Sequence, residues 1–222
     1  MLAVLADRFA DQLSGLHILD TGVSTGIIAN SLAEHVAQVT GPDIDDAAVA
    51  FARQTFARPN LHFLVGDSLA IPCPANSFDA VICTHVYEHV PDADRLLREI
   101  NRVLKPGGWC YFAAGNRLKV IEPHYGLPFL SWLPRPLAHR YLQLSGKGSY
   151  YYEKHLSLAG LRRLTSAFRC IDYTNRIIAN PAAFHAEYML APGSLKNRLA
   201  GLVAARAFWL MPSYIWMLQK RK

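Results

Sequence analysis

A short motif near the start of the chain has residues suited to holding a small ligand. Residues 18–26 read I-L-D-T-G-V-S-T-G, so an acid follows an apolar run and two glycines follow the acid. Gly22 and Gly26 allow the backbone to turn tightly and to lie close to a ligand. A carboxylate at Asp20 would repel a pyrophosphate, and Ile27 stands where a dinucleotide-binding motif needs its third glycine. The motif predicts a ligand with a cationic or hydroxyl-rich group.

Two further acids follow apolar runs at comparable places. Asp43 can accept hydrogen bonds from both hydroxyls of an adenosine ribose. Asp67 can accept one from the exocyclic amine of adenine, and the N–H of Ser68 can meet a ring nitrogen. An acid that follows a strand is, taken alone, more often a helix cap or part of a solvated turn. Together, and in this order, they predict a ligand that contains adenosine.

The elements that must position these residues alternate regularly through the first half of the chain. The pattern predicts strands at residues 16–20, 36–40, 61–65, 78–84 and 109–114. It predicts helices at residues 3–13, 27–35, 47–58 (after Asp45 and Asp46, which suit a helix N-terminus) and 92–104. Strands joined by single helices form βαβ units, and these predict a doubly wound α/β fold with a mostly parallel sheet and helices on both faces. Ligands of such folds bind beyond the carboxyl ends of the strands.

The second half of the chain has a different character. Residues 117–155 are rich in proline, aromatic and basic residues and lack clean periodicity, which favours an inserted cap or lid. Regular patterns return as a helix at 157–167, a strand at 170–178, a basic amphipathic helix at 195–208 and a strand at 214–219. We expect one domain over residues 1–222 with the cap inserted in it.

Charge divides the chain in the same way. Residues 1–116 carry 7 basic and 13 acidic side chains, a net charge of −6, whereas residues 117–222 carry 16 and 4, a net charge of +12. The excess of positive charge in the second half predicts an anionic substrate or an anionic surface. The four cysteines have no metal-ligand spacing, and we expect reduced thiols, a cytoplasmic location and no secretion signal.

One stretch, residues 199–218, has the length and apolar content of a membrane span. Arg206 and Pro212 interrupt it, and both are costly inside hydrocarbon. A helix followed by a buried strand fits these residues better, and contact with a membrane surface stays open as an alternative.

The motifs together resemble those of the class I S-adenosylmethionine-dependent methyltransferases. The resemblance is closer to the small-molecule branch, type 11, that includes ubiquinone and menaquinone biosynthesis-like enzymes. It covers residues 16–116, with N-S-F-D-A-V at 76–81, Y-E-H-V-P-D at 87–92 and R-V-L-K-P-G-G at 102–108 besides the motifs above. It implies a seven-stranded sheet of order 3-2-1-4-5-7-6 whose last strand, residues 214–219, is antiparallel.

The resemblance also implies the cofactor, S-adenosylmethionine, and the residues that hold it. These are Asp20, Thr21, Gly22, Ser24, Gly26, Asp43, Ile44, Asp67, Ser68, Thr84 and His85. Ser24 stands where the family has a glycine, and a serine fits there if its φ is negative or if strain is absorbed. We therefore expect Ser24 to affect cofactor affinity.

The reaction that the resemblance implies is an in-line displacement from a sulfonium methyl, for which we expect no metal. His85 is the candidate general base, and the alternative is a polar loop residue that lines the cofactor site. His124 and Tyr125 are the catalytic candidates in the cap, and the alternative is packing beneath it.

The leading functional hypothesis is methyl transfer to a small or amphipathic acceptor, such as a lipid or glycolipid precursor. The alternatives are an RNA methyltransferase and a methyltransferase-like protein that binds the cofactor without turnover. Nucleic acid is disfavoured as a partner because the sequence has no appended nucleic-acid-binding module. The acceptor atom and the oligomeric state are not fixed by the sequence.

Overall fold

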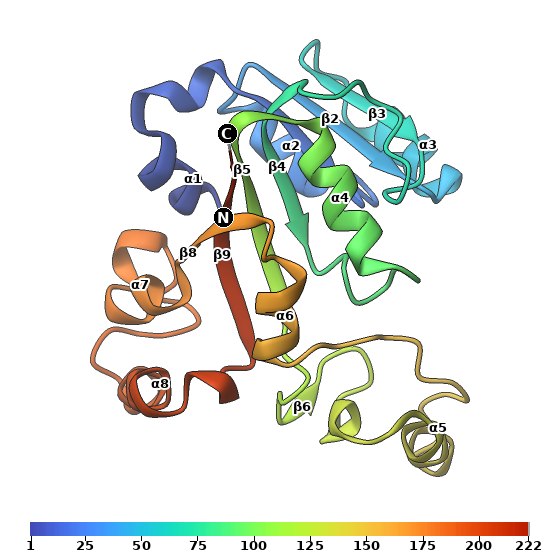
Figure 1. The fold of residues 1–222 in the computed structure, drawn as a ribbon, viewed down its shortest axis with the longest axis vertical. Coiled ribbons are helices and arrows are strands. Elements are labelled where there is room, and N and C mark those ends of the chain that lie inside the picture. Colours follow the sequence, from blue (N-terminus) through green and yellow to red (C-terminus); the bar gives the residue numbers. More distant parts are fainter. Residues whose placement is uncertain (222) are drawn as a thin grey trace.

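A seven-stranded sheet forms the centre of the structure, a computed structural model that describes residues 1–221 (Figure 1). The strands are β1 (His17–Thr21), β2 (Gln38–Asp43), β3 (Leu61–Val65), β4 (Phe78–Thr84), β5 (Leu104–Gly115), β8 (Phe168–Asp172) and β9 (Ser213–Lys220). Their order is β3-β2-β1-β4-β5-β9-β8, and β9 is antiparallel to both of its neighbours. This is the predicted order 3-2-1-4-5-7-6, with β9 as the seventh strand of the sheet, so the predicted fold class is confirmed.

Helices cover both faces of the sheet because the central strands are apolar on both faces. Ile18 and Ile82 pack in one core with α1 (Leu2–Phe9), α2 (Ile27–Ala33) and α3 (Asp46–Thr55). Leu19 and Val81, one position away in each strand, pack in the other core with α4 (Ala93–Val103) and α6 (Leu158–Leu164). The two cores fix the strands, and with them the loops at the carboxyl ends.

Side-chain caps set where several helices begin. The Asp45 carboxylate accepts hydrogen bonds from the N–H groups of Ala47 and Ala48 at the start of α3, at 3.0 and 3.1 Å. Asp92 accepts one from the Arg95 N–H at the start of α4, at 2.9 Å. These acids therefore end the loops that follow β2 and β4 at defined points.

The strand predicted at residues 170–178 is wrong beyond residue 172. β8 ends at Asp172, and Thr174–Ala179 form the helix α7. The Asp172 carboxylate accepts hydrogen bonds from the N–H groups of Thr174 (3.2 Å) and Asn175 (3.1 Å), which starts a helix where the β-rich residues alone favoured a strand.

The strand predicted at residues 109–114 begins earlier in the structure, because residues 104–108 also belong to β5. The pairing of β5 with β4 shifts register between Phe78 and Ala80, so the glycines here make an irregular strand start and no separate turn.

Residues 117–155 extend beyond the carboxyl end of β5 (Figure 1). They contain a short hairpin, β6 (Ile121–Glu122) with β7 (Leu127–Pro128), and the helix α5 (Arg135–Leu144). Their own small apolar cluster consists of Leu127, Leu130, Ala138, Leu142 and Tyr151.

The chain ends with α8 (Leu195–Arg206) and β9, which corresponds to the predicted helix and strand. None of the residues of α8 is buried. Within residues 1–221, every helix falls short of the length and apolar character that crossing a bilayer requires.

Candidate cofactor and acceptor site

The loop after β1 is tied down to the end of β2. The N–H groups of Gly22 and Val23 donate hydrogen bonds to the Pro42 carbonyl, at 3.1 and 3.2 Å. Gly26 has a φ of +82°, and a Cβ atom there would lie 2.8 Å from the ring of Phe63. Glycine is therefore required at residue 26 both by its backbone angle and by the close packing of the loop on β3.

Of the two conformations expected for Ser24, a negative φ or a strained backbone, the structure has the strained one. Its φ is +49°, in the left-handed region, which costs a residue with a Cβ about 1–2 kcal/mol. Its N–H donates a hydrogen bond of 2.6 Å to Oδ2 of Asp43, and a charged acceptor makes this bond stronger than a neutral one. The strain at Ser24 is thus offset by an interaction that also orients the acid at the end of β2.

Asp43 is held by a second bond, because its Oδ1 accepts from the N–H of Asp45 at 3.0 Å. Each carboxylate oxygen has further acceptor capacity, which suits a ribose diol. Ile44 lies beside it with 74% of its surface exposed, an apolar side chain available to contact a planar ring.

The end of β3 lies beside that of β2, since the Gly66 N–H donates to the Asp43 carbonyl at 2.8 Å. The Asp67 carboxylate accepts a hydrogen bond from the Leu69 N–H at 2.8 Å and remains exposed, and Ser68 is half-buried. The structure therefore places Asp43 and Asp67, the acids predicted to bind the ribose and the adenine, at one edge of the sheet.

Asp20 is buried at the end of β1. Burial, and to a smaller extent the negative charge of Asp43, raise the pKa of its carboxyl to about 7. Such a carboxyl is stabilised by an incoming cation, as the ammonium group of a methionine moiety would supply. Thr21 donates its hydroxyl to the Ile82 carbonyl at 2.8 Å, whereas the buried hydroxyl oxygen of Thr84 has no hydrogen-bond partner among residues 1–221. These features fit S-adenosylmethionine.

His85 follows β4 directly and is also held in a left-handed conformation, with a φ of +57°. Its N–H donates to the Ala113 carbonyl at 2.9 Å, and its Nδ1 lies 3.1 Å from Oε1 of Glu88. Half of the imidazole is exposed (49%), while Glu88 is buried. Strained residues held in this way cluster at functional sites.

The carboxyl of Glu88 is ionised despite its burial. Burial, the largest single effect, raises its pKa, but the hydrogen bond from His85, a backbone hydrogen bond and the charges of His85 and His155 together outweigh it, so the net pKa is lowered. A Glu88 carboxylate that accepts from Nδ1–H leaves Nε2 of His85 as the basic nitrogen. The arrangement is that of a general base with an orienting acid.

A second polar cluster surrounds Glu122, which is fully buried in the hairpin of β6 and β7. Its Oε1 lies 2.7 Å from Nδ1 of His124, 3.4 Å from Nε2 of His155 and 3.6 Å from Nζ of Lys119. Burial alone would raise the pKa of Glu122. The histidines and Lys119 lower it by more, so the net pKa is about 2. Of this cluster only His124 was predicted from the sequence.

The loop after β4 is joined to the end of the 117–155 segment. The Lys154 N–H donates to the Glu88 carbonyl at 2.8 Å, and the Leu156 N–H donates to the Tyr87 hydroxyl at 3.1 Å. The rings of His89 and His124 meet edge to face with centroids 5.0 Å apart. The structure thus brings His124 to the loop that carries His85.

The side chain of Tyr125, the residue after His124, packs instead on Tyr151, with ring centroids 5.8 Å apart. A cavity of about 270 Å³ opens nearby. It is lined by Arg117, Ser131, Leu133, Pro134, Arg135, Tyr151, Glu153, Lys154, His155 and Leu156. Neither His124 nor Tyr125 lines this cavity, although both contact residues that do.

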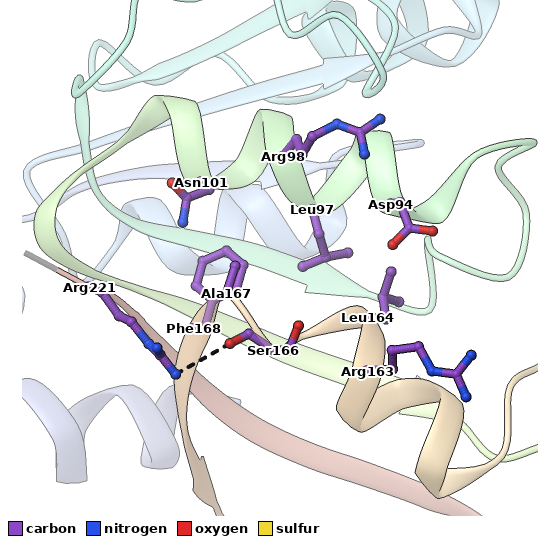
Figure 2. Close-up of a pocket in the computed structure, with 10 residues that line it drawn as sticks. All are labelled: Asp94, Leu97, Arg98, Asn101, Arg163, Leu164, Ser166, Ala167, Phe168 and Arg221. Atoms are coloured by element: carbon purple, nitrogen blue, oxygen red, sulfur yellow. Dashed lines mark hydrogen bonds between the residues drawn. The ribbon is translucent and has the colours of Figure 1, made fainter.

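A larger groove of about 480 Å³ lies between α4 and α6 (Figure 2). It is lined by Asp94, Leu97, Arg98, Asn101, Arg163, Leu164, Ser166, Ala167, Phe168 and Arg221. None of these is a predicted cofactor or catalytic residue, and the site built from the strand ends is a different one.

Comparison with known proteins agrees with this geometry. Residues 19–112 match the family model described as a methyltransferase domain. The ubiquinone biosynthesis O-methyltransferase of Idiomarina loihiensis is 29% identical over 186 residues, which cover 79% of this chain and 70% of that protein. The protein of the same name from Chromobacterium violaceum is 34% identical over 139 residues, and this match spans 58% of each chain.

Solved structures share the fold over nearly the whole chain. A putative methyltransferase from Bacillus halodurans superposes with a TM-score of 0.61 at 16% identity, covering 100% of this chain and 99% of that one. The [4+2]-cyclase SpnF gives 0.60 at 23% identity, covering 99% and 80%. An S-adenosylmethionine-dependent methyltransferase from Mesorhizobium loti gives 0.61 at 17% identity, covering 97% and 95%. These structures show the shared fold, and the sequence matches support a class I S-adenosylmethionine-dependent methyltransferase of the type 11 branch.

Proposed function

We propose that the chain transfers the methyl group of S-adenosylmethionine to a hydroxyl group of a small amphipathic molecule. The observation that carries this proposal is His85, a base held by buried Glu88 directly beyond β4 and next to the strand ends of the cofactor site. The curated relatives are named as O-methyltransferases, which supports an oxygen acceptor.

In this proposal, different residues of the cofactor site bind different parts of the cofactor. Asp20 pairs with the ammonium group, Asp43 accepts the ribose hydroxyls, and Asp67 with Ser68 reads the adenine edge. Thr21, Gly22, Ser24 and Gly26 form the loop beneath the methionine end, while Ile44 offers an exposed apolar side chain and Thr84 a buried hydroxyl group without a partner among residues 1–221. When bound, the cofactor supplies a methyl group already activated by a positively charged sulfur.

The chain then has to align the acceptor and receive its proton. Nε2 of His85 takes the hydroxyl proton as the oxygen forms its bond to the methyl carbon. The bound cofactor would supply the methyl group, and the electron pair of its carbon–sulfur bond would remain on the sulfur as a neutral thioether. The Glu88 carboxylate stabilises the imidazolium that results.

We assign the acceptor to the cavity of about 270 Å³ and propose that residues 117–155 act as its cap within one domain. Tyr151, Leu133 and Leu156 give the cavity an apolar wall, while Arg117 and Arg135 give it positive charge. An apolar body with an anionic group, as in a lipid or glycolipid precursor, fits this lining. His124 and Tyr125 contribute from beside the cavity.

Contact with a membrane surface would bring such an acceptor within reach. The exposed apolar side chains of Leu195, Leu199 and Leu202 lie on α8 together with Lys196 and Arg198. Apolar and basic side chains on one helix suit the surface of an anionic membrane. Flotation with anionic vesicles and not with neutral ones is the expected result.

The test is transfer of tritium from the methyl group of S-adenosylmethionine into cell extracts. We expect label in the lipid-soluble fraction, loss of that label with His85→Ala, and no loss with His62→Ala, whose side chain is exposed on β3. Label in the RNA fraction would favour the RNA methyltransferase alternative. Binding of S-adenosylhomocysteine without transfer to any fraction would favour a protein without turnover.

A further inference from the structure

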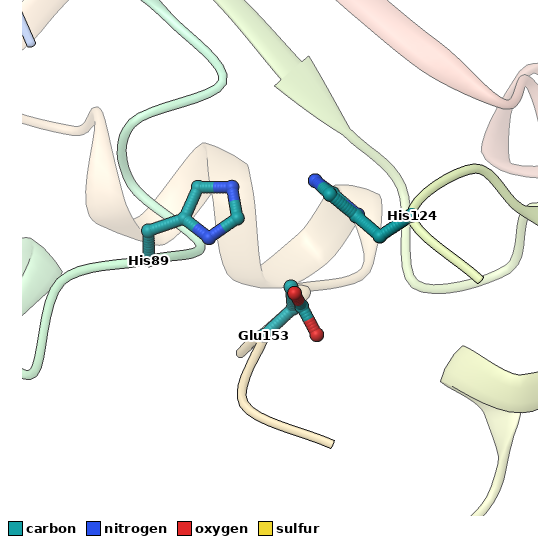
Figure 3. A group of neighbouring side chains, drawn as sticks. All are labelled: His89, His124 and Glu153. Carbon is teal, nitrogen blue, oxygen red and sulfur yellow. The ribbon is translucent and has the colours of Figure 1, made fainter. Parts of the chain in front are cut away.

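Three side chains from distant parts of the sequence converge beside the proposed acceptor cavity. His89 comes from the loop after β4, His124 from the turn between β6 and β7, and Glu153 from the segment that precedes α6. Each offers one ligand atom, and the three atoms all lie within 4.8 Å of one another. Figure 3 shows the two imidazole rings side by side, one edge-on to the other, with the Glu153 carboxyl group below the gap that separates them.

The acid of this trio is buried and incompletely bonded. Glu153 is only 8% exposed, and its Oε2 has no hydrogen-bond partner within the described residues. A buried carboxylate oxygen without a partner is costly unless a cation or a donor meets it.

The second ligand is already oriented. Glu122 accepts from Nδ1 of His124 at 2.7 Å, so Nε2 is the nitrogen left free to bind a metal. A carboxylate behind a histidine is the usual outer partner of a metal-bound imidazole, because it fixes the ring and its tautomer.

The charges of the region leave room for a divalent cation. Glu88, Glu122 and Glu153 are buried, and all three act on the charge of Lys119, the buried lysine among them. Three carboxylates against one ammonium group leave a net charge of −2 when the histidines are neutral. Arg117, Arg135 and Lys154 line the proposed acceptor cavity but are exposed, whereas a divalent cation would supply positive charge directly at the buried Oε2 of Glu153.

A neighbouring trio, Glu122 with His124 and His155, also has three possible ligand atoms. There, however, Nζ of Lys119 lies 3.6 Å from Oε1 of Glu122. The ammonium group already occupies the side of that carboxylate and would repel a metal ion, so the trio that contains Glu153 is the better site.

We propose that His89, His124 and Glu153 bind a divalent first-row transition-metal cation such as Zn²⁺ or Mn²⁺. Two imidazole nitrogens and one carboxylate oxygen are a donor set these ions accept, with open positions left for water or substrate. His89 is exposed, so its ring can rotate to close the distance to the metal, while His124 stays oriented by Glu122.

The role of the metal deepens the proposed function and rests on it. Glu153 also lines the cavity assigned to the acceptor, so an acceptor oxygen there can reach an open position on the metal. A metal-bound hydroxyl loses its proton more readily, which assists the attack on the methyl group.

Co²⁺ titration of the tag-free, chelator-treated full chain tests the site by visible absorption, and competition with Zn²⁺ tests its affinity. We expect one equivalent of Co²⁺ to give ligand-field bands, and we expect His124→Ala and Glu153→Gln to abolish them. Glu122→Gln removes only the outer partner and should weaken binding about 10–100-fold. The matched control His62→Ala should bind as the parent does.

Calorimetry with S-adenosylhomocysteine on the same samples shows that each variant is folded and separates the two proposals. Chain that binds S-adenosylhomocysteine but gives no Co²⁺ bands, or bands that survive both His124→Ala and Glu153→Gln, would overturn the metal site alone. Stoichiometric metal binding by a chain that methylates no extract would support the site and contradict the proposed function.

Discussion

Replacement of Asp20 by asparagine should stabilise the ligand-free chain and weaken cofactor binding. Burial raises the pKa of this carboxyl from 3.8 to about 7, and Asp43 contributes to the rise. The folded chain therefore holds the Asp20 proton more tightly than the unfolded chain. Its contribution to stability is greatest below about pH 4, falls as the pH rises towards 7, and is lowest above that.

The size of the effect follows from the same two values. A difference of about three pH units corresponds to about 4 kcal/mol, the cost of ionising Asp20 in the folded, ligand-free chain. Asparagine has the same shape and cannot ionise. Asp20→Asn should therefore raise the free energy of unfolding at pH 8 by up to about 4 kcal/mol and leave it nearly unchanged at about pH 4.

Cofactor affinity should move in the opposite direction. A ligand ammonium group pairs with the ionised carboxylate, and with a pKa of about 7 only about one Asp20 in ten is ionised at pH 6. S-adenosylhomocysteine should bind the parent chain about tenfold more weakly at pH 6 than at pH 8, and bind Asp20→Asn weakly at both. Calorimetry and thermal unfolding over this pH range measure both effects, with Asp11→Asn, an exposed acid, as the control. A parent affinity independent of pH, or an Asp20→Asn chain that binds normally, would refute the reasoning.

Three further substitutions test other parts of the site. Ser24→Gly removes a serine with a left-handed backbone and should raise the free energy of unfolding by about 0.5–1 kcal/mol. Urea unfolding measures this change, and a lower free energy of unfolding would contradict the claim that Ser24 is strained. Glu88→Gln removes the negative charge beside His85, the general base, and should lower kcat about 10–100-fold with little change in KM. A change in KM alone would mean that Glu88 only shapes the pocket. Neutralising Arg135, Arg140 and Lys147 together should reduce methylation of an anionic acceptor, and full activity of that variant would exclude an anionic-substrate role for them.

The sheet could be predicted from sequence because its information is local. β3 and β4 were predicted with the bounds that the structure has, since each is an apolar run between turn residues. The place of β9 between β5 and β8 is a long-range pairing, and only the resemblance to a family supplied it. Residues 174–178 were predicted wrongly because a single capping carboxylate, that of Asp172, outweighed their β propensity.

The polar residues of the second half were harder to find. The acids at the strand ends can be recognised because they follow apolar runs. Glu122, Glu153 and His155 instead lie in a segment without periodicity. Their burial depends on contacts across the chain, such as the bond from the Lys154 N–H to the Glu88 carbonyl. The acid two residues before His124 was the one signal available, and it gains meaning only when both side chains are seen together.

The central claim is that the cofactor lies over the carboxyl ends of β1, β2 and β3 with its sulfur facing His85. A crystal structure of the chain with S-adenosylhomocysteine tests it most directly. We predict ribose hydroxyls on Asp43, the adenine beside Asp67, the ammonium group on Asp20 and the sulfur beside His85. S-adenosylhomocysteine bound instead in the groove between α4 and α6 would contradict it (Figure 2).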